Sequence, residues 1–295
     1  MPSYSDTTYI LNSFNKKGYC FPIDLLSEEN NFYYHKYIDS IKKIKKNSLK
    51  FEHKFKSHLV FKWVNDLMRD KKIVSLVKQI LGENILCWNS ILFFKPKKTK
   101  YFVGWHEDRT YWRLKNNKIV TISIALSDSN PENGCLKILK NKIDNIKYKI
   151  HKPKFNMLAR GQEAIISENE EFDYIVLKSG QCAIFDQNII HGSESNNSSE
   201  DRLLLAFRYI TPDNTTEMNH KSASLICGED SFGFYQKEPI PKEDFQEDCL
   251  KFHGKLMSNQ AAIFGKSKLE KFNLGFVSPV IKSDFVRGLY YKYLK

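Results

Sequence analysis

The chain has 295 residues, enough to bury a full core, and its 41% hydrophobic and 14% aromatic content excludes a disordered protein. No stretch has the length and apolarity of a membrane span, and residues 1–19 lack the apolar core of a signal peptide, so we expect a cytoplasmic protein. The six cysteines have no CxxC spacing, which argues against a disulfide framework or a zinc site.

The net charge of +12 comes from 46 basic and 34 acidic residues. Apart from short runs such as 42–46 and 95–98, the lysines are dispersed along the chain. A nucleic-acid interface would be expected to cluster them. We therefore interpret the lysines as solvated surface residues and do not expect a nucleic-acid partner.

The first part of the chain predicts one strand and two helices. A short strand is expected over 14–23, and an acidic start at 27–29 precedes a helix expected over 29–45. Apolar residues recur at helical spacing over 61–81, and Gly82 is a suitable stop for that second helix.

From residue 84 to 212, short apolar or alternating runs separated by turn-forming clusters predict a β-sandwich or barrel. The expected strands are 85–94, 101–106, 118–127, 134–139, 173–176, 181–186 and 202–210. The rest of the chain is poorly periodic. We predict one domain over 1–295, with an N-terminal strand and helices (1–83), a β core (84–212) and an extension (213–295) that packs on the core or covers its site.

A candidate metal site begins at His106-Glu107-Asp108, the only place where a histidine has a carboxylate two residues later. In a strand, residues two apart point to the same face, so His106 and Asp108 can hold one ion together. Such a pair arises easily by chance. His191, which ends an apolar strand-like run, is the candidate third ligand. Together they would form the two-histidine, one-carboxylate triad of non-haem Fe(II) oxygenases.

Arg202 begins a strand that follows the turn-rich segment after His191, so a hairpin would bring the two residues close together. Oxygenases that use 2-oxoglutarate need a cation for its distal carboxylate, and arginine offers a bidentate fork with a permanent charge. Arg202 could instead be a solvated strand end. Arg208 would share its face, either as a second charge toward the substrate or as part of an internal ion pair.

Three motifs, in order, resemble those of the phytanoyl-CoA dioxygenase family. Residues Trp105-His106-Glu107-Asp108-Arg109-Thr110-Tyr111-Trp112 are similar to its WHxDxxYW signature. Residues Ala125-Leu126-Ser127-Asp128-Ser129-Asn130-Pro131-Glu132-Asn133-Gly134 are similar to its ALxDxTxENG segment. His191-Gly192-Ser193, with Arg202 eleven residues after His191, resembles its distal HGS…R motif. The resemblance extends over most of residues 10–212.

The resemblance implies a mainly β fold, a double-stranded β-helix (jelly-roll, cupin-like) with flanking helices, that binds Fe(II) and 2-oxoglutarate. It implies that His106, Asp108 and His191 are the iron ligands and that Arg202 holds the distal carboxylate of the co-substrate.

Further residues are assigned by position within the same resemblance. Thr121 falls where relatives place a hydroxyl on 2-oxoglutarate, and Asn89 falls where they often have an amide. Tyr111 and Trp112 either line the substrate pocket, as Arg208 could, or pack in the core.

The implied function is that of an Fe(II)- and 2-oxoglutarate-dependent dioxygenase that uses O2 to hydroxylate an unactivated C–H bond of a small polar or anionic metabolite, with release of succinate and CO2. Desaturation or cyclisation by the same chemistry stays open. Asp108 argues against a halogenase, which has alanine or glycine at that position. A non-catalytic jelly-roll binding module is the alternative of another class. The expected partner is a small-molecule substrate, not a membrane, and nothing in the sequence indicates the oligomeric state.

Overall fold

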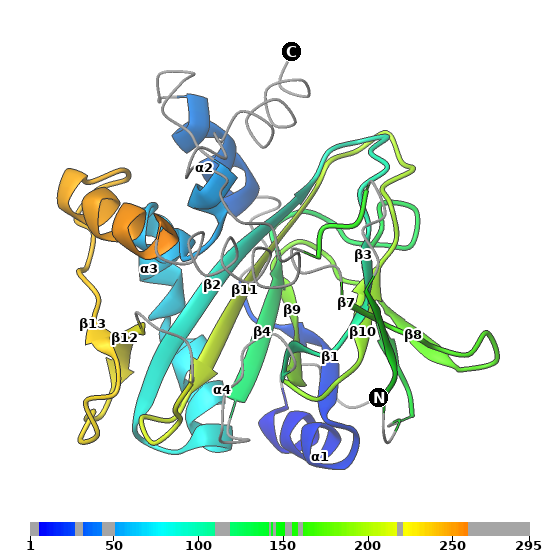
Figure 1. The fold of residues 1–295 in the computed structure, drawn as a ribbon, viewed down its shortest axis with the longest axis horizontal. Coiled ribbons are helices and arrows are strands. Elements are labelled where there is room, and N and C mark those ends of the chain that lie inside the picture. Colours follow the sequence, from blue (N-terminus) through cyan, green and yellow to red (C-terminus); the bar gives the residue numbers. More distant parts are fainter. Residues whose placement is uncertain are drawn as a thin grey trace, which may run out of the picture.

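The computed structural model of the chain describes residues 6–26, 32–42, 51–109, 119–141, 143, 146–150, 155–158, 162–216 and 221–258 (Figure 1). The strands of this part of the chain form two main β-sheets, with helices packed on the outside of the larger one. None of the described helices combines the length and the apolarity needed to cross a membrane.

The larger sheet has seven strands in the order β1-β9-β4-β11-β2-β12-β13. In chain order they are β1 (Tyr19–Asp24), β2 (Ile85–Lys95), β4 (Ile119–Ala125), β9 (Gln181–Asp186), β11 (Arg202–Ile210), β12 (Ser222–Cys227) and β13 (Gln236–Lys237). The central strand β11 pairs antiparallel with β2 on one side and β4 on the other, and all its residues are buried. Because side chains alternate along a strand, β11 presents one set to the helices and the other to the second sheet.

Helices cover one face of the larger sheet (Figure 1). They are α1 (Thr7–Lys17), α2 (Phe32–Lys42), α3 (Lys62–Met68) and α4 (Lys71–Leu81), with short 3-10 turns at η1 (Phe51–Lys54) and η2 (Ser57–Leu59). Buried residues of these four helices share an apolar cluster with Leu203, Leu205, Phe207 and Tyr209 of β11. The odd-numbered side chains of β11 therefore anchor the helical layer.

The second sheet has four strands in the order β3-β10-β5-β8. They are β3 (Val103–His106), β5 (Leu136–Leu139), β8 (Phe172–Ile175) and β10 (His191–Ser193), and a separate hairpin pairs β6 (Tyr148–Ile150) with β7 (Gln162–Ala164). Ile138 and Ile175 of this sheet pack against Leu204 and Ala125 of the larger one. The second sheet thus faces the even-numbered side chains of β11. A mainly β protein with flanking helices, as predicted, is confirmed.

Two of the predicted N-terminal elements differ from those observed. Residues 14–17 end helix α1 instead of beginning a strand, because Asp6 caps its start by accepting from the Thr8 and Tyr9 N–H groups and Gly18 ends it at φ 82°. The helix predicted over 61–81 is divided into α3 and α4. Asp70 interrupts it and caps α4 by accepting from the N–H groups of residues 72 and 73.

Residues 221–258 contact both the larger sheet and the helical layer. Strand β12 pairs with β2 and so extends the larger sheet, and residues 247–258 are helical. Asp244 accepts hydrogen bonds from the Lys62 N–H at 2.8 Å and from the Ser40 hydroxyl at 2.6 Å. The Phe245 N–H donates to the Val60 carbonyl at 2.7 Å. These contacts tie the segment to the helices of the N-terminal part.

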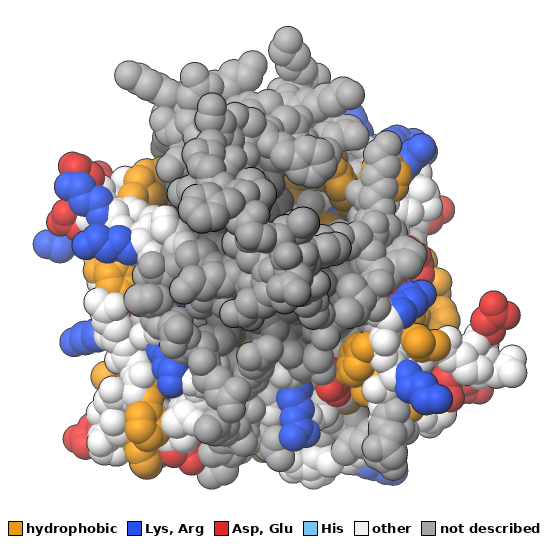
Figure 2. Space-filling model, viewed as in Figure 1, with side chains coloured by type: hydrophobic (Ala, Val, Ile, Leu, Met, Phe, Trp, Pro, Cys, Tyr) orange, Lys and Arg blue, Asp and Glu red, His pale blue; other side chains and the backbone are white. Residues whose placement is uncertain are grey.

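Charged side chains are mixed over the visible surface. On the face in Figure 2, the Lys and Arg side chains of the described residues are scattered among acidic and apolar ones and form no single basic patch.

Candidate active site

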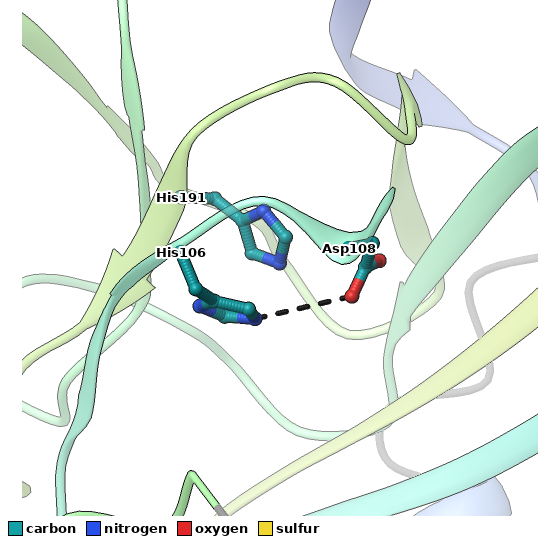
Figure 3. Close-up of side chains that lie close together, drawn as sticks. All are labelled: His106, Asp108 and His191. Carbon is teal, nitrogen blue, oxygen red and sulfur yellow. Dashed lines mark ion pairs between the residues drawn. The ribbon is translucent and has the colours of Figure 1, made fainter. Parts of the chain in front are cut away.

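His106, Asp108 and His191 come together between the two sheets. His106 ends β3 and His191 begins β10, and the two are directly opposite in the antiparallel register of these strands. Asp108 follows β3 by two residues. One ligand atom from each residue lies within 4.8 Å of the other two, and all three residues are buried. Figure 3 shows the three side chains pointing toward one another.

The histidines present the same ring nitrogen to this shared space. Nδ1 of His106 lies 3.0 Å from the Gly104 carbonyl, and Nδ1 of His191 lies 2.9 Å from the Ile189 carbonyl. A carbonyl only accepts, so each Nδ1 carries the hydrogen and each Nε2 keeps its lone pair. Nε2 of His106 is 3.9 Å from Oδ1 of Asp108. Two imidazole nitrogens and a carboxylate oxygen therefore converge.

Burial favours the neutral form of both imidazoles. It is the largest cause that lowers the pKa of His106 to about 3, with further lowering by the nearby His191. Burial likewise lowers the pKa of His191. Neutral imidazole is the form that binds a metal, so the site needs no deprotonation of histidine at neutral pH.

Asn89, Arg208 and Thr121 form one row across the inner face of the larger sheet. In register, Arg208 of β11 lies between Asn89 of β2 and Thr121 of β4. Nε of Arg208 is 3.6 Å from Oδ2 of Asp108, which places the row beside the triad. Oδ1 of Asn89 accepts from the Lys56 N–H at 3.3 Å. Oγ1 of Thr121 is buried without a hydrogen-bond partner in the described part of the chain.

Arg202 lies six positions before Arg208 on the same strand and the same face. At about 3.3 Å per residue, their Cα atoms are about 20 Å apart. Arg202 is 2% exposed, so it is not the solvated strand end that its sequence context allowed. Among the described residues no carboxylate forms an ion pair with it, and its Nε has no hydrogen-bond partner. Burial lowers its pKa to about 10, so it keeps its charge at neutral pH.

Lys95 is a second buried cation at this end of the sheet, and the sequence interpretation missed it. It is the cross-strand partner of Arg202 and is fully buried, whereas the sequence predicts that the lysines lie on the surface. Its Nζ contacts Oγ of Ser193 at 2.7 Å, the Gly134 carbonyl at 3.3 Å and the Glu194 carbonyl. Burial, followed by the charge of Arg202, lowers the pKa of Lys95 to about 6.

Three small side chains lie on the inner face next to the row that contains Arg208, and Leu204 lies between them and Arg202. Ala206 on β11, Ser123 on β4 and Ala183 on β9 form one row across the inner face, two residues along β11 from Arg208. All three are buried. Tyr111 and Trp112, predicted to line the substrate pocket or the core, lie outside the described residues.

Comparison with known proteins agrees with this arrangement. The family model described as phytanoyl-CoA dioxygenase (PhyH) matches residues 14–204. A probable alpha-ketoglutarate-dependent hypophosphite dioxygenase of Stutzerimonas stutzeri is 28% identical over 161 residues, which are 53% of this chain and 56% of the relative, so little more than half of that protein is matched. An ectoine dioxygenase of Nocardia farcinica is 22% identical over 213 residues, 63% of this chain and 72% of the relative.

Among solved structures, the non-heme monooxygenase ThoJ in its apo form superposes with a TM-score of 0.74 at 22% identity, over 88% of this chain and 99% of ThoJ. This likeness confirms the predicted fold. Since the family model covers well over half of the chain, with the triad and Arg202 inside the match, this chain belongs to the phytanoyl-CoA dioxygenase (PhyH) family.

Proposed function

We propose that the protein is an Fe(II)- and 2-oxoglutarate-dependent dioxygenase. The observation that carries the proposal is the combination of the His106–Asp108–His191 cluster with Arg202, a buried cation that has no carboxylate partner in the described part of the chain. Two neutral imidazoles and one carboxylate are the donor set of the non-haem Fe(II) triad. A buried guanidinium without an anion is costly unless a ligand supplies one.

The residues of this chain divide the work of binding between the two ends of the inner face. His106, Asp108 and His191 would hold Fe(II), and Arg202 would take the distal carboxylate of 2-oxoglutarate in a bidentate pair. Lys95 would add positive charge beside that carboxylate once it takes up a proton. When bound together, iron and 2-oxoglutarate activate O2 and drive substrate oxidation while the 2-oxo acid is converted to succinate and CO2.

Thr121 and Asn89 would act near the metal end of the co-substrate. The buried Oγ1 of Thr121 is available to donate a hydrogen bond, and the Asn89 amide is oriented by the Lys56 N–H. Ala206 and Ser123 have small side chains on the inner face beside the metal end, and Leu204 lies between them and Arg202. A flexible dicarboxylate would lie above them. Thr121 and Ser123 of this inner face are buried, so bulk water is excluded and their polar contacts with the co-substrate would be strengthened.

The substrate we propose is a small polar or anionic metabolite, hydroxylated at an unactivated C–H bond. The names of the two relatives, a hypophosphite dioxygenase and an ectoine dioxygenase, support a small molecule. Tyr111 and Trp112 are the candidates to line its pocket. Desaturation or cyclisation would use the same residues. Asp108 fills the position that a halogenase leaves to chloride, and a binding module would have no need for Arg202 as a buried anion clamp.

The test is anaerobic reconstitution with Fe(II) and 2-oxoglutarate, followed by visible absorption for the weak charge-transfer band of the chelate. Wild-type protein should show the band. His106→Ala should abolish it by removing a metal ligand, and Arg202→Ala by weakening co-substrate binding. His35→Ala, at an exposed histidine of α2, should leave it unchanged. A wild-type protein without the band would refute the proposal. Succinate release stimulated by candidate metabolites would then identify the substrate.

A further inference from the structure

Arg208 contacts the oxygen of Asp108 that faces away from His106. Its Nε lies 3.6 Å from Oδ2 of Asp108, whereas Oδ1 of the same carboxylate lies 3.9 Å from Nε2 of His106. Both side chains of the Arg208–Asp108 pair are 5% exposed. The two oxygens of Asp108 therefore have different neighbours: a cation on one side and a metal-ligand histidine on the other.

The fold fixes Arg208 in this place. It is the seventh residue of the central strand β11, on the inner face, with hydrogen-bonded strands on both sides. Its cross-strand neighbours Asn89 and Thr121 are both shorter. The 3.6 Å separation makes this an ion pair and not a hydrogen bond, and Oδ2 of Asp108 has no hydrogen-bond partner in the described part of the chain. The attraction between the two groups is therefore electrostatic, and burial leaves little water to screen it. The sequence left two roles open for Arg208, a charge toward the substrate or an internal ion pair. The contact with Asp108 supports the ion pair.

We propose that Arg208 is a positioning residue that holds Oδ2 of Asp108, so that the carboxylate offers only Oδ1 to a metal ion. The proposal rests on the proposed function, since it concerns the same site. A carboxylate binds a metal through one oxygen or through both. The facial triad requires open positions for the co-substrate and O2. A second oxygen from Asp108 would take one of those positions, and the attraction between Arg208 and Oδ2 opposes this.

The test counts the positions that the protein leaves open on Mn(II), without 2-oxoglutarate. Water-proton relaxation per bound Mn(II) reports how many water molecules contact the ion. With one oxygen from Asp108, wild-type protein should retain about three. Arg208→Gln should retain about two, a fall of about a third, because Oδ2 is freed to bind. Arg208→Lys keeps the charge and should restore most of the wild-type value.

Arg202→Met is the matched control, because it removes the other inner-face arginine of the same strand. It should keep the wild-type relaxation per bound Mn(II) and lose affinity for 2-oxoglutarate. Circular dichroism would confirm that each variant is folded. If Arg208→Gln does not fold, a wild-type protein with only about two water molecules on Mn(II) would still overturn the proposal.

Two results would overturn the proposal: wild-type protein with only about two water molecules on Mn(II), or a folded Arg208→Gln variant with the wild-type relaxation. Failure of the proposed function would look different. In that case Mn(II) would not bind to wild-type protein, or it would bind equally well to His106→Ala.

Discussion

Lys95 and Arg202 face each other directly across β2 and β11, and the two side chains are 0% and 2% exposed. Two adjacent buried cations repel each other, and no carboxylate in the described part of the chain pairs with Arg202. Lys95 avoids this repulsion by losing its proton more easily, because burial and the neighbouring Arg202 lower its pKa to about 6. An anionic ligand beside Lys95 would raise this pKa again.

We therefore predict that 2-oxoglutarate binding is accompanied by proton uptake. At pH 7.5, Lys95 is mostly neutral in the free protein, because the pH lies above its pKa of about 6. A carboxylate beside it raises that pKa, so up to about one proton is taken up on binding. Calorimetric titration of the Fe(II) form, under anaerobic conditions, in two buffers of different ionisation enthalpy measures this uptake.

The control is Lys95→Met, which should bind with the same apparent enthalpy in both buffers. Equal enthalpies for the wild-type protein would contradict the prediction. Because the charge on Arg202 does not change at this pH, the difference between the two proteins belongs to the lysine.

Glu238 forms a second buried charge cluster, away from the triad, that joins distant parts of the chain. Its carboxylate accepts from Nζ of Lys56 at 2.5 Å and from the hydroxyls of Ser222 and Ser224 at 2.7 Å each. Nε2 of His58 lies 2.7 Å from Oε2 of Glu238, the oxygen that also accepts from Ser224. The carboxylate and the imidazole are fully buried. The cluster thus ties β12 to the segment that carries Lys56, whose N–H orients the Asn89 side chain.

Glu238→Gln should lower the free energy of unfolding by about 3–5 kcal/mol, because it leaves the Lys56 ammonium buried without its anion. Denaturant unfolding followed by circular dichroism measures the change. Glu247→Gln is the matched control: Glu247 pairs with Lys251 on the surface, where both side chains are more than half exposed, and its loss should not be measurable. A similar effect of the two substitutions would argue against a structural role for the cluster.

Acid should destabilise the metal-free protein in two steps. Burial lowers the pKa of His58, His106 and His191, so the unfolded chain binds protons that the folded one does not, and stability falls as the pH drops below about 6.5. The charge of Lys56, helped by the hydrogen bond with His58, overcomes burial and holds the pKa of Glu238 well below its ordinary 4.5. Its contribution is present above pH 4.5 and is lost below it.

Unfolding midpoints measured from pH 8 to 4 would show this profile. Glu238→Gln should keep the loss that begins below about pH 6.5 and lack the second, below 4.5. A midpoint that stays constant between pH 7 and 5 would be inconsistent with neutral buried histidines.

The ordered motifs predicted the triad and Arg202, because metal and carboxylate binding demand particular residue types at particular places. Lys95 has no such local signal. It stands at the end of an apolar strand beside other lysines, and it is buried by contacts with Gly134 and Glu194, which are 39 and 99 residues away. Burial of this kind depends on how the loops cross, which a single sequence does not encode locally.

The helix boundaries show a different limit. Asp6 and Asp70 are both capping residues, but apolar periodicity alone marks neither the start of α1 nor the break between α3 and α4. The row of Asn89, Arg208 and Thr121 needed the strand register, since these residues come from three strands. The alternation of side chains along a strand predicted that Arg202 and Arg208 share a face. It did not predict that Arg208 lies beside the triad and Arg202 at the other end of that face.

Gly134, the last residue of the ALxDxTxENG-like segment, gives a physical reason for a glycine in that motif. Its φ is +71°, and a Cβ there would overlap the backbone carbonyl of Glu194 and lie 2.7 Å from that of Ser195. Gly134→Ala should therefore lower the free energy of unfolding by about 2 kcal/mol or more, since left-handed strain of about 1 kcal/mol is joined by this overlap. It should also weaken 2-oxoglutarate binding, because the Glu194 carbonyl, which the added Cβ would displace, is one of the groups that hold Lys95.

Gly233→Ala separates strain from overlap. Gly233 has a similar φ of +63° but nothing within 4 Å of the added Cβ, so its substitution should lower the free energy of unfolding by only about 1 kcal/mol and leave co-substrate binding unchanged. Thermal unfolding of the two variants, with calorimetric titration of 2-oxoglutarate, provides the comparison. Equal losses of stability would mean that the Glu194 loop moves freely, in which case it could not fix Lys95 beside Arg202.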